Sequence, residues 1–487
     1  MQARRFRVSR LAACAAGLAL WAAGAGAGPG VTVLHGFGYS DGQYPIGRLL
    51  YGSDGRIYGT TYGGGNAGLG TAFAVAKDKT FTLLHSFKGD DGNSLASGLI
   101  ELADGSLLGS TPQGSYCLGT VCSNFGGSVF AMGADGSGFA TLRRFPGNGV
   151  PEGSAPGTLV DGGDGFFYGT TNTGGAHGFG TVFRIAGDGS LGTLHSFDGV
   201  NGGAPGPLLT RGSDGYFYGS LRYGANTYDA GAIFRIAPGG GYALLHTFDP
   251  LTEGRGPSGG LVELAGEFYG VTGAQGVGIG GAGTVFKIHP NGVVTRLKAF
   301  NGTDGAGPVG PLALGPDGKL YGLTHGGGPD NGGTIFRLAP DGGDFMTLHG
   351  LVFADGTGPS SGPIIGADGM LYGAGTYGGG TSSAVGSVFQ FDPLARQPAK
   401  LAMSKYCYNE FDMCFKPINT TVGHAYDVIW TSANLSDCVA SGAWAGRKPP
   451  AGRLQFVPLK PGVFTYRLRC TGPGGAVKSG GVTVTVG

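Results

Sequence analysis

The sequence has 487 residues, of which 106 are glycine, about 22% against the ~7% that is usual in proteins. This fraction excludes an ordinary helical enzyme domain, and 41% hydrophobic residues without a Gly-X-Y period exclude both a disordered chain and a collagen. Only 13% of the residues are charged, with 32 basic against 31 acidic groups, which excludes a basic surface for nucleic acids and an acidic tail.

Residues 1–28 show the three parts of a secretory signal peptide. Four arginines come first: Arg4, Arg5, Arg7 and Arg10. An uncharged apolar run from Leu11 to Ala23 follows, and then a stretch of alternating glycine and alanine. We predict cleavage near Ala27 and a secreted or periplasmic bacterial protein. No later segment reaches the ~20 apolar residues of a membrane span, so we expect no span.

A repeat of about 51 residues occupies residues 30–392. Its most regular feature is a Tyr-Gly pair, for which the second copy has Leu108-Gly109. The pairs begin at Tyr58, Tyr168, Tyr218, Tyr269, Tyr321 and Tyr372. Turn signals such as Asp-Gly precede the pairs, and variants of Gly-Thr-Val-Phe and Leu-His-Ser-Phe follow them. Each copy therefore contains four short β-rich runs between turns, which predicts a four-stranded antiparallel meander.

Seven such meanders in a ring would form a seven-bladed β-propeller, an all-β fold. The first recognisable element, Val31 to Phe37, is a lone fourth strand, and the last copy stops after its third strand at Phe391. We therefore predict that the N-terminal strand completes the seventh blade and closes the ring. Prolines in several first strands (Pro207, Pro311 and Pro363) predict that this strand is innermost, because proline is confined to free sheet edges.

The repeat Asp-Gly-x-x-Tyr-Gly-Thr-Thr, followed by Gly-Gly, Gly-Thr-Val-Phe and Leu-His-Ser-Phe, resembles the Gloeo/Verruco (GloVer) tandem repeat of exported bacterial proteins. The resemblance covers nearly the whole of residues 30–392. It implies a propeller-type fold and export from the cytoplasm. It implies no particular reaction, because the family has no shared activity to transfer.

The composition changes after residue 392. A proline-containing linker at 393–400 leads to residues 401–487, where glycine thins and cysteine appears. Alternating apolar residues, as in Val482 to Val486, predict the short strands of an immunoglobulin-like (Ig-like) sandwich. The sequences around Cys438 and Cys470 resemble those of bacterial Ig-like modules. Trp430 precedes Cys438 instead of lying between the two cysteines, which departs from the antibody pattern.

Removal of Cys14 with the signal peptide leaves six cysteines, and an even number in an exported protein predicts disulfides. By proximity and by the Ig-like resemblance we pair Cys117 with Cys122, Cys407 with Cys414, and Cys438 with Cys470. Because no histidine lies near them at metal-binding spacing, we expect no zinc and no cofactor.

Strand parity places two kinds of loop on one side of the propeller, which we call the open face: the loop between strands two and three, and the connection from strand four to the next blade. Each connection carries an acidic residue before a glycine, and these residues form the acidic set. Its members are Asp41, Asp91, Glu152, Glu253, Asp304 and Asp355, with Asn201 in the fourth place. They would either cap their own turns or form an inward ring that binds a structural cation or sugar hydroxyls.

A second set of candidates follows the Tyr-Gly pairs, and we call it the loop set. It comprises Tyr62, Arg222, Tyr223, His325 and Tyr377. Exposed rings on rigid loops suit stacking on sugars or other flat partners, with plain loop packing as the alternative. We interpret the repeated histidines of the fourth strands as structural: His35, His85, His195, His246 and His349. No residue pattern indicates a catalytic group.

We therefore expect a monomeric, exported, non-catalytic binding or structural protein whose open face recognises a glycan, a cell-envelope component or another protein. The alternative is an extracellular polysaccharide-active enzyme, a hydrolase or lyase, with carboxylates of the acidic set as acid and base. Nucleic acid is not an expected partner. The sequence leaves the identity of the ligand open.

Overall fold

The computed structural model describes residues 30–94, 97–118, 121–147, 151–224, 229–273, 281–380 and 384–393, and within 400–486 the strands alone. The predicted signal peptide lies outside these residues. The chain divides into two compact units, Met1–Phe391 and Asp392–Gly487. All regular elements of the described residues are β-strands. None of the described segments forms a helix long and apolar enough to cross a membrane.

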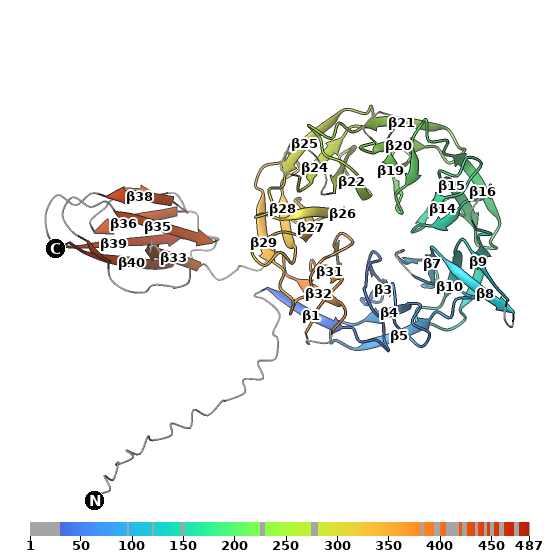
Figure 1. Cartoon of the computed structure of the whole chain (residues 1–487), viewed down its shortest axis with the longest axis horizontal. Helices are drawn as coiled ribbons and strands as arrows, with labels where there is room; N and C mark the ends of the chain where they lie inside the picture. The colour runs from blue at the N-terminus through green and yellow to red at the C-terminus, as the bar shows by residue number, and fades with distance from the viewer. Residues whose placement is uncertain are drawn as a thin grey trace, which may run out of the picture. The chain divides into compact units, whose positions relative to one another are not determined.

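The first unit is a β-propeller of seven sheets arranged around a central axis (Figure 1). Blade 1 comprises β2 (Leu50–Tyr51), β3 (Ile57–Thr61), β4 (Thr71–Val75) and β5 (Phe81–Ser86). Blade 2 comprises β6 (Ile100–Glu101), β7 (Leu107–Thr111), β10 (Ser128–Met132) and β11 (Ala140–Arg144). Blade 3 comprises β12 (Ser154–Pro156), β13 (Val160–Asp161), β14 (Phe166–Thr173), β15 (Thr181–Ala186) and β16 (Leu191–Ser196). Blade 2 also carries the hairpin of β8 (Gly114–Leu118) and β9 (Val121–Phe125).

Blades 4 to 6 repeat this order. Blade 4 comprises β17 (Gly203–Pro205), β18 (Thr210–Arg211), β19 (Phe217–Tyr223), β20 (Ala232–Ile236) and β21 (Tyr242–Thr247). Blade 5 comprises β22 (Pro257–Leu264), β23 (Glu267–Thr272), β24 (Thr284–Ile288) and β25 (Val294–Ala299). Blade 6 comprises β26 (Ala306–Leu314), β27 (Leu320–Gly326), β28 (Thr334–Leu338) and β29 (Met346–Gly350). Neighbouring strands in every blade are antiparallel, which confirms the predicted seven-bladed all-β propeller.

Blade 7 draws its strands from both ends of the repeat region. It comprises β30 (Ile364–Ile365), β31 (Leu371–Gly375), β32 (Ser387–Phe391) and β1 (Val31–Gly36). β1 pairs antiparallel with β32, with Val31 opposite Phe391 and Gly36 opposite Ser387. β1 thus has the place in blade 7 that β5 has in blade 1, at the end of the sheet away from the first strand.

In the Tyr-Gly pair of a second strand, the tyrosine contacts the preceding turn and the glycine contacts the third strand. In five blades the buried tyrosine hydroxyl donates a hydrogen bond to the Asp of the preceding Asp-Gly turn, as Tyr218 does to Asp214 at 2.6 Å. Burial and this bond raise the pKa of Tyr218 to about 12. The glycine lies opposite the phenylalanine of the third strand, as Gly169 lies opposite Phe183. A Cβ on Gly169 would lie 2.7 Å from the Phe183 ring.

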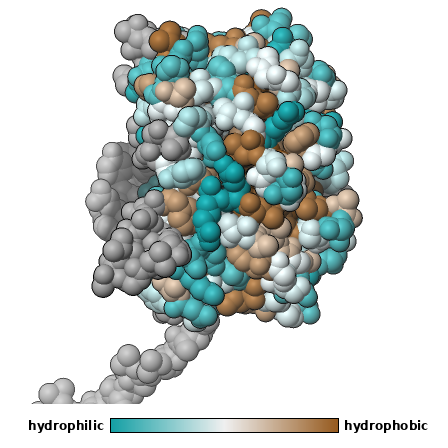
Figure 2. All heavy atoms as spheres, turned by 90° about the vertical axis from the view of Figure 1, so that its right-hand side faces the viewer, coloured by the Kyte–Doolittle hydropathy of each residue, from teal (hydrophilic) through white to brown (hydrophobic). Residues whose placement is uncertain are grey.

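The outer surface of the propeller alternates in character. Figure 2 shows hydrophobic areas that are broken up by hydrophilic residues on the side that it presents. The fourth strands fit this pattern, because most of their residues are half-buried, whereas the second and third strands are almost entirely buried. The hydrophobic core of the propeller lies between neighbouring blades.

The second unit contains two sheets. One comprises β33 (Lys400–Lys405), β35 (Tyr426–Ala433) and β38 (Gly452–Phe456); the other comprises β34 (Ile418–Thr420), β40 (Val477–Val486), β39 (Gly462–Thr471), β36 (Asp437–Gly442) and β37 (Gly446–Lys448). Cys438 and Cys470 lie directly opposite each other on β36 and β39, neighbouring strands of one sheet. An antibody-type disulfide instead joins the two sheets.

The contact between the Tyr-Gly glycine and the facing phenylalanine predicts a specific sensitivity. Gly169→Ala should destabilise the propeller by about 1–3 kcal/mol, because the added methyl group overpacks the interface between strands two and three. Gly187→Ala in the same blade is the matched control, since a Cβ there meets nothing within 4 Å. Thermal denaturation of both variants measures the difference, and equal stability of the two would contradict this explanation of the motif.

Candidate functional site

The acidic set pairs with basic side chains of the fourth strands. Each carboxylate lies within 3.0 Å of a His, Arg or Lys side chain from the strand that precedes its loop. The pairs are His35–Asp41, His85–Asp91, Arg143–Glu152, His246–Glu253, Lys298–Asp304 and His349–Asp355. In the remaining place Asn201 replaces the acid, and among the described residues the buried Nε2 of His195 has no hydrogen-bond partner.

The acidic residues make two further kinds of hydrogen bond, one through the carboxylate and one through the backbone carbonyl. Asp41, for example, accepts a hydrogen bond from the Gly38 backbone N–H at 2.7 Å. Its backbone carbonyl accepts one from Thr71, on the third strand of the next blade, at 3.0 Å. Corresponding hydroxyl bonds are made to Asp91, Glu152, Glu253, Asp304 and Asp355. The acidic set thus caps its own loops, and none of its members lines the pocket at the axis.

Burial shifts the pKa values within these pairs. Burial opposes ionisation of Asp91, but its hydrogen bonds with His85 and with the Lys88 backbone N–H outweigh that effect and hold its pKa below the usual value. Burial lowers the pKa of His35, although Asp41 opposes the shift, and it also lowers the pKa of His195. These groups belong to the framework of the propeller.

The loop set is exposed but distributed over several blades. Tyr62, Tyr223 and Tyr377 are 46%, 41% and 51% exposed, and they come from blades 1, 4 and 7. His325 and Tyr377 line one groove of about 590 Å³ together with Phe353, which is 51% exposed. The structure therefore brings His325 and Tyr377 together and leaves Tyr62 and Tyr223 on other blades.

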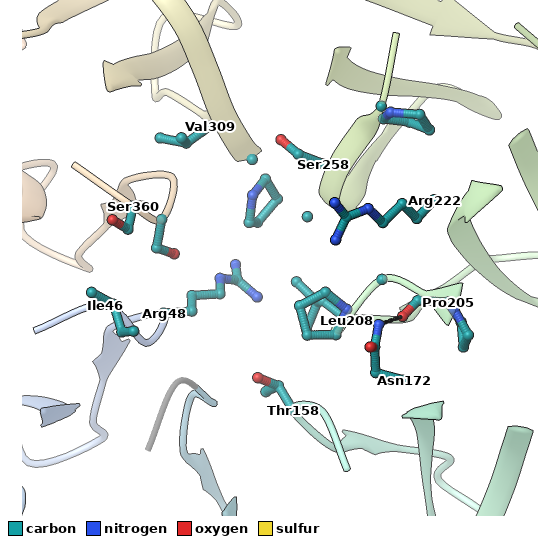
Figure 3. A pocket seen from close by; sticks show the side chains of 18 of the residues that line it. Ile46, Arg48, Thr158, Asn172, Pro205, Leu208, Arg222, Ser258, Val309 and Ser360 are labelled. Carbon is teal, nitrogen blue, oxygen red and sulfur yellow. Dashed lines mark hydrogen bonds between the residues drawn. The ribbon is translucent and has the colours of Figure 1, made fainter. Parts of the chain in front are cut away.

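Arg222, the fifth member of the loop set, lines a different site, a pocket of about 440 Å³ at the propeller axis. We call it the axial pocket. Most of its lining comes from the first strands and the connections before them, and the second strands β14 and β19 add Asn172 and Arg222. Pro207 and Pro311 also line it, as expected if the first strand is innermost. Figure 3 shows Arg48 and Arg222 pointing into this pocket from opposite sides, with Ser258, Ser360 and Thr158 around them.

Arg48 forms part of the floor of the axial pocket. Arg48, Thr158 and Leu208 also line a second pocket, of about 470 Å³, formed by the other end of the first strands. These three residues therefore separate the two pockets. The Arg48 side chain is exposed to water inside the ring, and the protein around it lowers the pKa of its guanidinium by desolvation. An arginine nevertheless keeps its charge at neutral pH.

Arg48 is not among the residues predicted from the sequence, although its charge distinguishes it from the other copies of the repeat. The residue ten positions before each Tyr-Gly pair is Arg48 in the first copy, and it is uncharged in the six others: Gly98, Thr158, Leu208, Gly259, Pro311 and Gly362. A charge at a position that otherwise holds small or apolar residues has no role in the repeat itself. Arg48 is therefore a candidate ligand-binding residue.

No acidic residue lines the axial pocket. Within the described part of the chain, neither Arg48 nor Arg222 forms an ion pair, and no cluster of three or more His, Cys, Asp or Glu residues could hold a metal ion. The propeller segments outside the described residues, such as 225–228 and 274–280, contain no Asp or Glu. The axial pocket therefore presents two positive charges and several hydroxyl groups.

The pairing of the acidic set predicts how stability depends on pH. Asp91→Asn should lower the free energy of unfolding at pH 7 by about 1–3 kcal/mol, because a buried charge-assisted hydrogen bond is lost. Since the pKa of Asp91 is lowered in the folded protein, this contribution is present above the unfolded pKa and is lost as the pH falls through the folded pKa. Denaturant unfolding at several pH values should show the difference from wild type shrink below about pH 4.

Asp90→Asn is the matched control for this prediction, because Asp90 is the exposed neighbour of the buried Asp91. It should leave stability within about 0.5 kcal/mol of wild type. If both variants were equally stable at pH 7, the carboxylate of Asp91 would not be structural, and it would return to the candidate ligand-binding groups.

Comparison with known structures finds propellers of low sequence identity. The extracellular domain assigned to a hybrid two-component system of B. thetaiotaomicron superposes with a TM-score of 0.53 at 11% identity, covering 94% of this chain and 58% of that one. The extracellular domain assigned to a one-component system of the same bacterium has a TM-score of 0.48 at 11% identity, covering 94% of this chain and 58% of that one. A fungal alcohol oxidase in complex with copper has a TM-score of 0.43 at 12% identity, covering 94% of this chain and 99% of that one. At these identities the likeness shows the fold alone.

A search of curated proteins found no match to this sequence. The family model of the Gloeobacter/Verrucomicrobia repeat, in contrast, matches residues 117–312 and 208–412. The two matches together cover residues 117–412, more than half of the chain, and include the repeats of blades 3 to 7 except the strand β1. The chain belongs to the Gloeobacter/Verrucomicrobia repeat family.

Proposed function

We propose that this protein is an exported binding protein that recognises its ligand on the open face of the propeller and does not catalyse a reaction. The ligand is a glycan, a cell-envelope component or a protein. The observation that carries the proposal is the contrast between two groups of side chains on that face. The acidic set is bonded within the framework, whereas Arg48, Arg222 and the exposed rings of the loop set point to solvent or into a pocket.

The extracellular propellers of bacterial sensor systems support this proposal at the level of fold. This chain spans 58% of the length of the extracellular domain of the hybrid two-component system, so whatever that larger protein senses is not transferred. A propeller alone is compatible with binding and with catalysis. The choice between them therefore rests on the side chains.

The alternative, a polysaccharide-active enzyme, needs two carboxylates that face a common substrate about 5–10 Å apart. Each carboxylate of the acidic set is instead paired with a His, Arg or Lys side chain of the preceding fourth strand, and among the described residues no Asp or Glu lines the axial pocket. This arrangement favours binding. A screen of the purified protein for degradation of polysaccharides tests the alternative directly, and sustained turnover abolished by Asp41→Asn would establish it in place of our proposal.

The binding proposal predicts that the exposed rings contribute to affinity. The triple variant Tyr62→Ala, Tyr223→Ala, Tyr377→Ala should weaken binding of a ligand identified on a glycan array by 10-fold or more, since each stacked ring contributes about 0.5–1.5 kcal/mol. Its melting temperature should stay near that of wild type, because all three side chains are exposed. Val293→Ala, in the exposed β24–β25 hairpin on the other face, is the control. Normal binding by the triple variant would contradict a role for these rings.

We also infer that β1 closes the ring. The supporting contacts are the β1–β32 pairing and the packing of Phe37 against Phe73 of blade 1, with ring centroids 4.9 Å apart. Deletion of residues 30–37 should therefore destabilise the whole propeller by exposing a sheet edge and a core. A chain that begins at Gly30 is the control. An unchanged melting temperature after the deletion would show that the ring does not depend on β1.

We further infer that the exported protein contains disulfides. Cys117 and Cys122 lie opposite each other on the β8–β9 hairpin, as Cys438 and Cys470 do on β36 and β39. Opposite residues of antiparallel strands have Cα atoms about 4.5–5.5 Å apart, within the range that a disulfide needs. Cys407 and Cys414 lie outside the described residues, and their pairing rests on proximity in the sequence. The two sheets of residues 400–486 support an Ig-like sandwich, with the Cys438–Cys470 link within one sheet.

Mass spectrometry of protein isolated from an oxidising compartment should show three disulfides and no free thiol. Peptide mapping should link Cys117 to Cys122 and Cys438 to Cys470. A free thiol at either of these pairs would contradict the inference from strand register, whereas loss of the Cys407–Cys414 link alone would contradict only the inference from proximity.

A further inference from the structure

The axial pocket combines features that select for one kind of ligand. Two guanidinium groups, from blades 1 and 4, point into it from opposite sides (Figure 3). Arginine presents paired N–H donors whose geometry matches the two oxygens of a carboxylate. With no acidic residue in the lining, these donors lack a partner of opposite charge inside the pocket.

The rest of the lining suits a hydroxylated ligand. Ser258, Ser360 and Thr158 supply hydroxyl groups, and Asn172 supplies an amide (Figure 3). The Oγ of Ser258 is buried and, among the described residues, has no hydrogen-bond partner. Because such a group costs free energy, an acceptor on a ligand would stabilise it once rotation about χ1 presents the hydroxyl to the pocket. Thr158 accepts a bond from the Gly98 backbone N–H at 2.8 Å, which leaves its own O–H available to donate.

The apolar part of the lining completes the description. Four prolines and Leu208 form much of the wall: Pro205, Pro207, Pro257 and Pro311. These rigid surfaces can pack against C–H groups of a sugar ring at little entropic cost. A volume of about 440 Å³, open on the side of the long loops, accommodates a terminal sugar unit with the remainder of a chain in solvent.

We propose that the axial pocket binds the carboxylate of an acidic sugar, a uronic acid unit, between Arg48 and Arg222. This inference rests on the proposed binding function and assigns its ligand class. Arg48, which belongs to the pocket floor, makes the deeper contact, and Arg222 closes over the carboxylate from the wall. The net charge of the sequence is +1, and removal of the four arginines of the predicted signal peptide makes it −3, so the mature protein as a whole does not attract polyanions and the selectivity arises from these two side chains.

The probes are short oligouronates of galacturonate, glucuronate and mannuronate, each paired with its methyl ester, which removes the charge and keeps the size. Isothermal titration calorimetry on the full mature chain should detect binding of at least one oligouronate, and its ester should bind 10-fold or more weakly. Inorganic phosphate is added as a competitor. Competition by phosphate stronger than that by the free uronate would overturn the assignment in favour of a phosphorylated ligand.

Two variants test the residues. Arg48→Gln and Arg222→Gln should each weaken oligouronate binding by 10-fold or more, whereas the control Arg211→Gln, an exposed arginine on β18, should leave it unchanged. The melting temperature of Arg48→Gln without ligand should stay near that of wild type, because the Arg48 side chain is exposed and forms no ion pair within the described residues. Normal oligouronate binding by both variants, or equal affinity for the acid and its ester, would overturn the inference.

The outcome also separates this inference from the proposed function. If a neutral glycan on the array bound to wild type and to Arg48→Gln alike, the binding function would stand and the uronate site would be wrong. If none of the oligouronates and no glycan bound, both would fail.

Discussion

At six of the seven junctions between neighbouring blades, one residue of the acidic set joins the two blades. Its carboxylate pairs with a His, Arg or Lys side chain of the preceding fourth strand, and its backbone carbonyl accepts a hydrogen bond from a hydroxyl group on the third strand of the next blade. Asp91 thereby joins His85 of blade 1 to Ser128 of blade 2. The spacing between blades is therefore set by short polar contacts, and the core can pack between the sheets.

This constraint separates structural from functional residues. Side chains that recur in most blades, such as the acidic set and the fourth-strand histidines, form contacts within the ring. Positions where one copy departs from the others are therefore the stronger candidates for a binding site. Arg48 and Arg222 are such departures. The residues that correspond to Arg48 in the other copies are all uncharged, and most of those that correspond to Arg222 are uncharged too. Both arginines point into the axial pocket.

Much of the fold and part of the site could be predicted from residues alone. The Tyr-Gly pair, the Asp-Gly turns and the number of copies predicted seven four-stranded blades. The loop set included Arg222, which lines the axial pocket, as well as His325 and Tyr377, which share a groove. The acidic set could not be assigned in advance, because a turn cap and a ligand-binding carboxylate have the same sequence pattern until their partners are known.

The sequence by itself determined the features that depend on neighbours along the chain: the turns, the alternation of each strand, and the glycine that faces a phenylalanine about fourteen residues later, as Gly169 faces Phe183. Only the tertiary structure decided which side chains meet at the axis. Arg48 and Arg222 belong to blades 1 and 4, and no local pattern relates them. They share a pocket because the blades are arranged around one axis, which brings the first strand of blade 1 and the end of β19, the second strand of blade 4, to the same pocket.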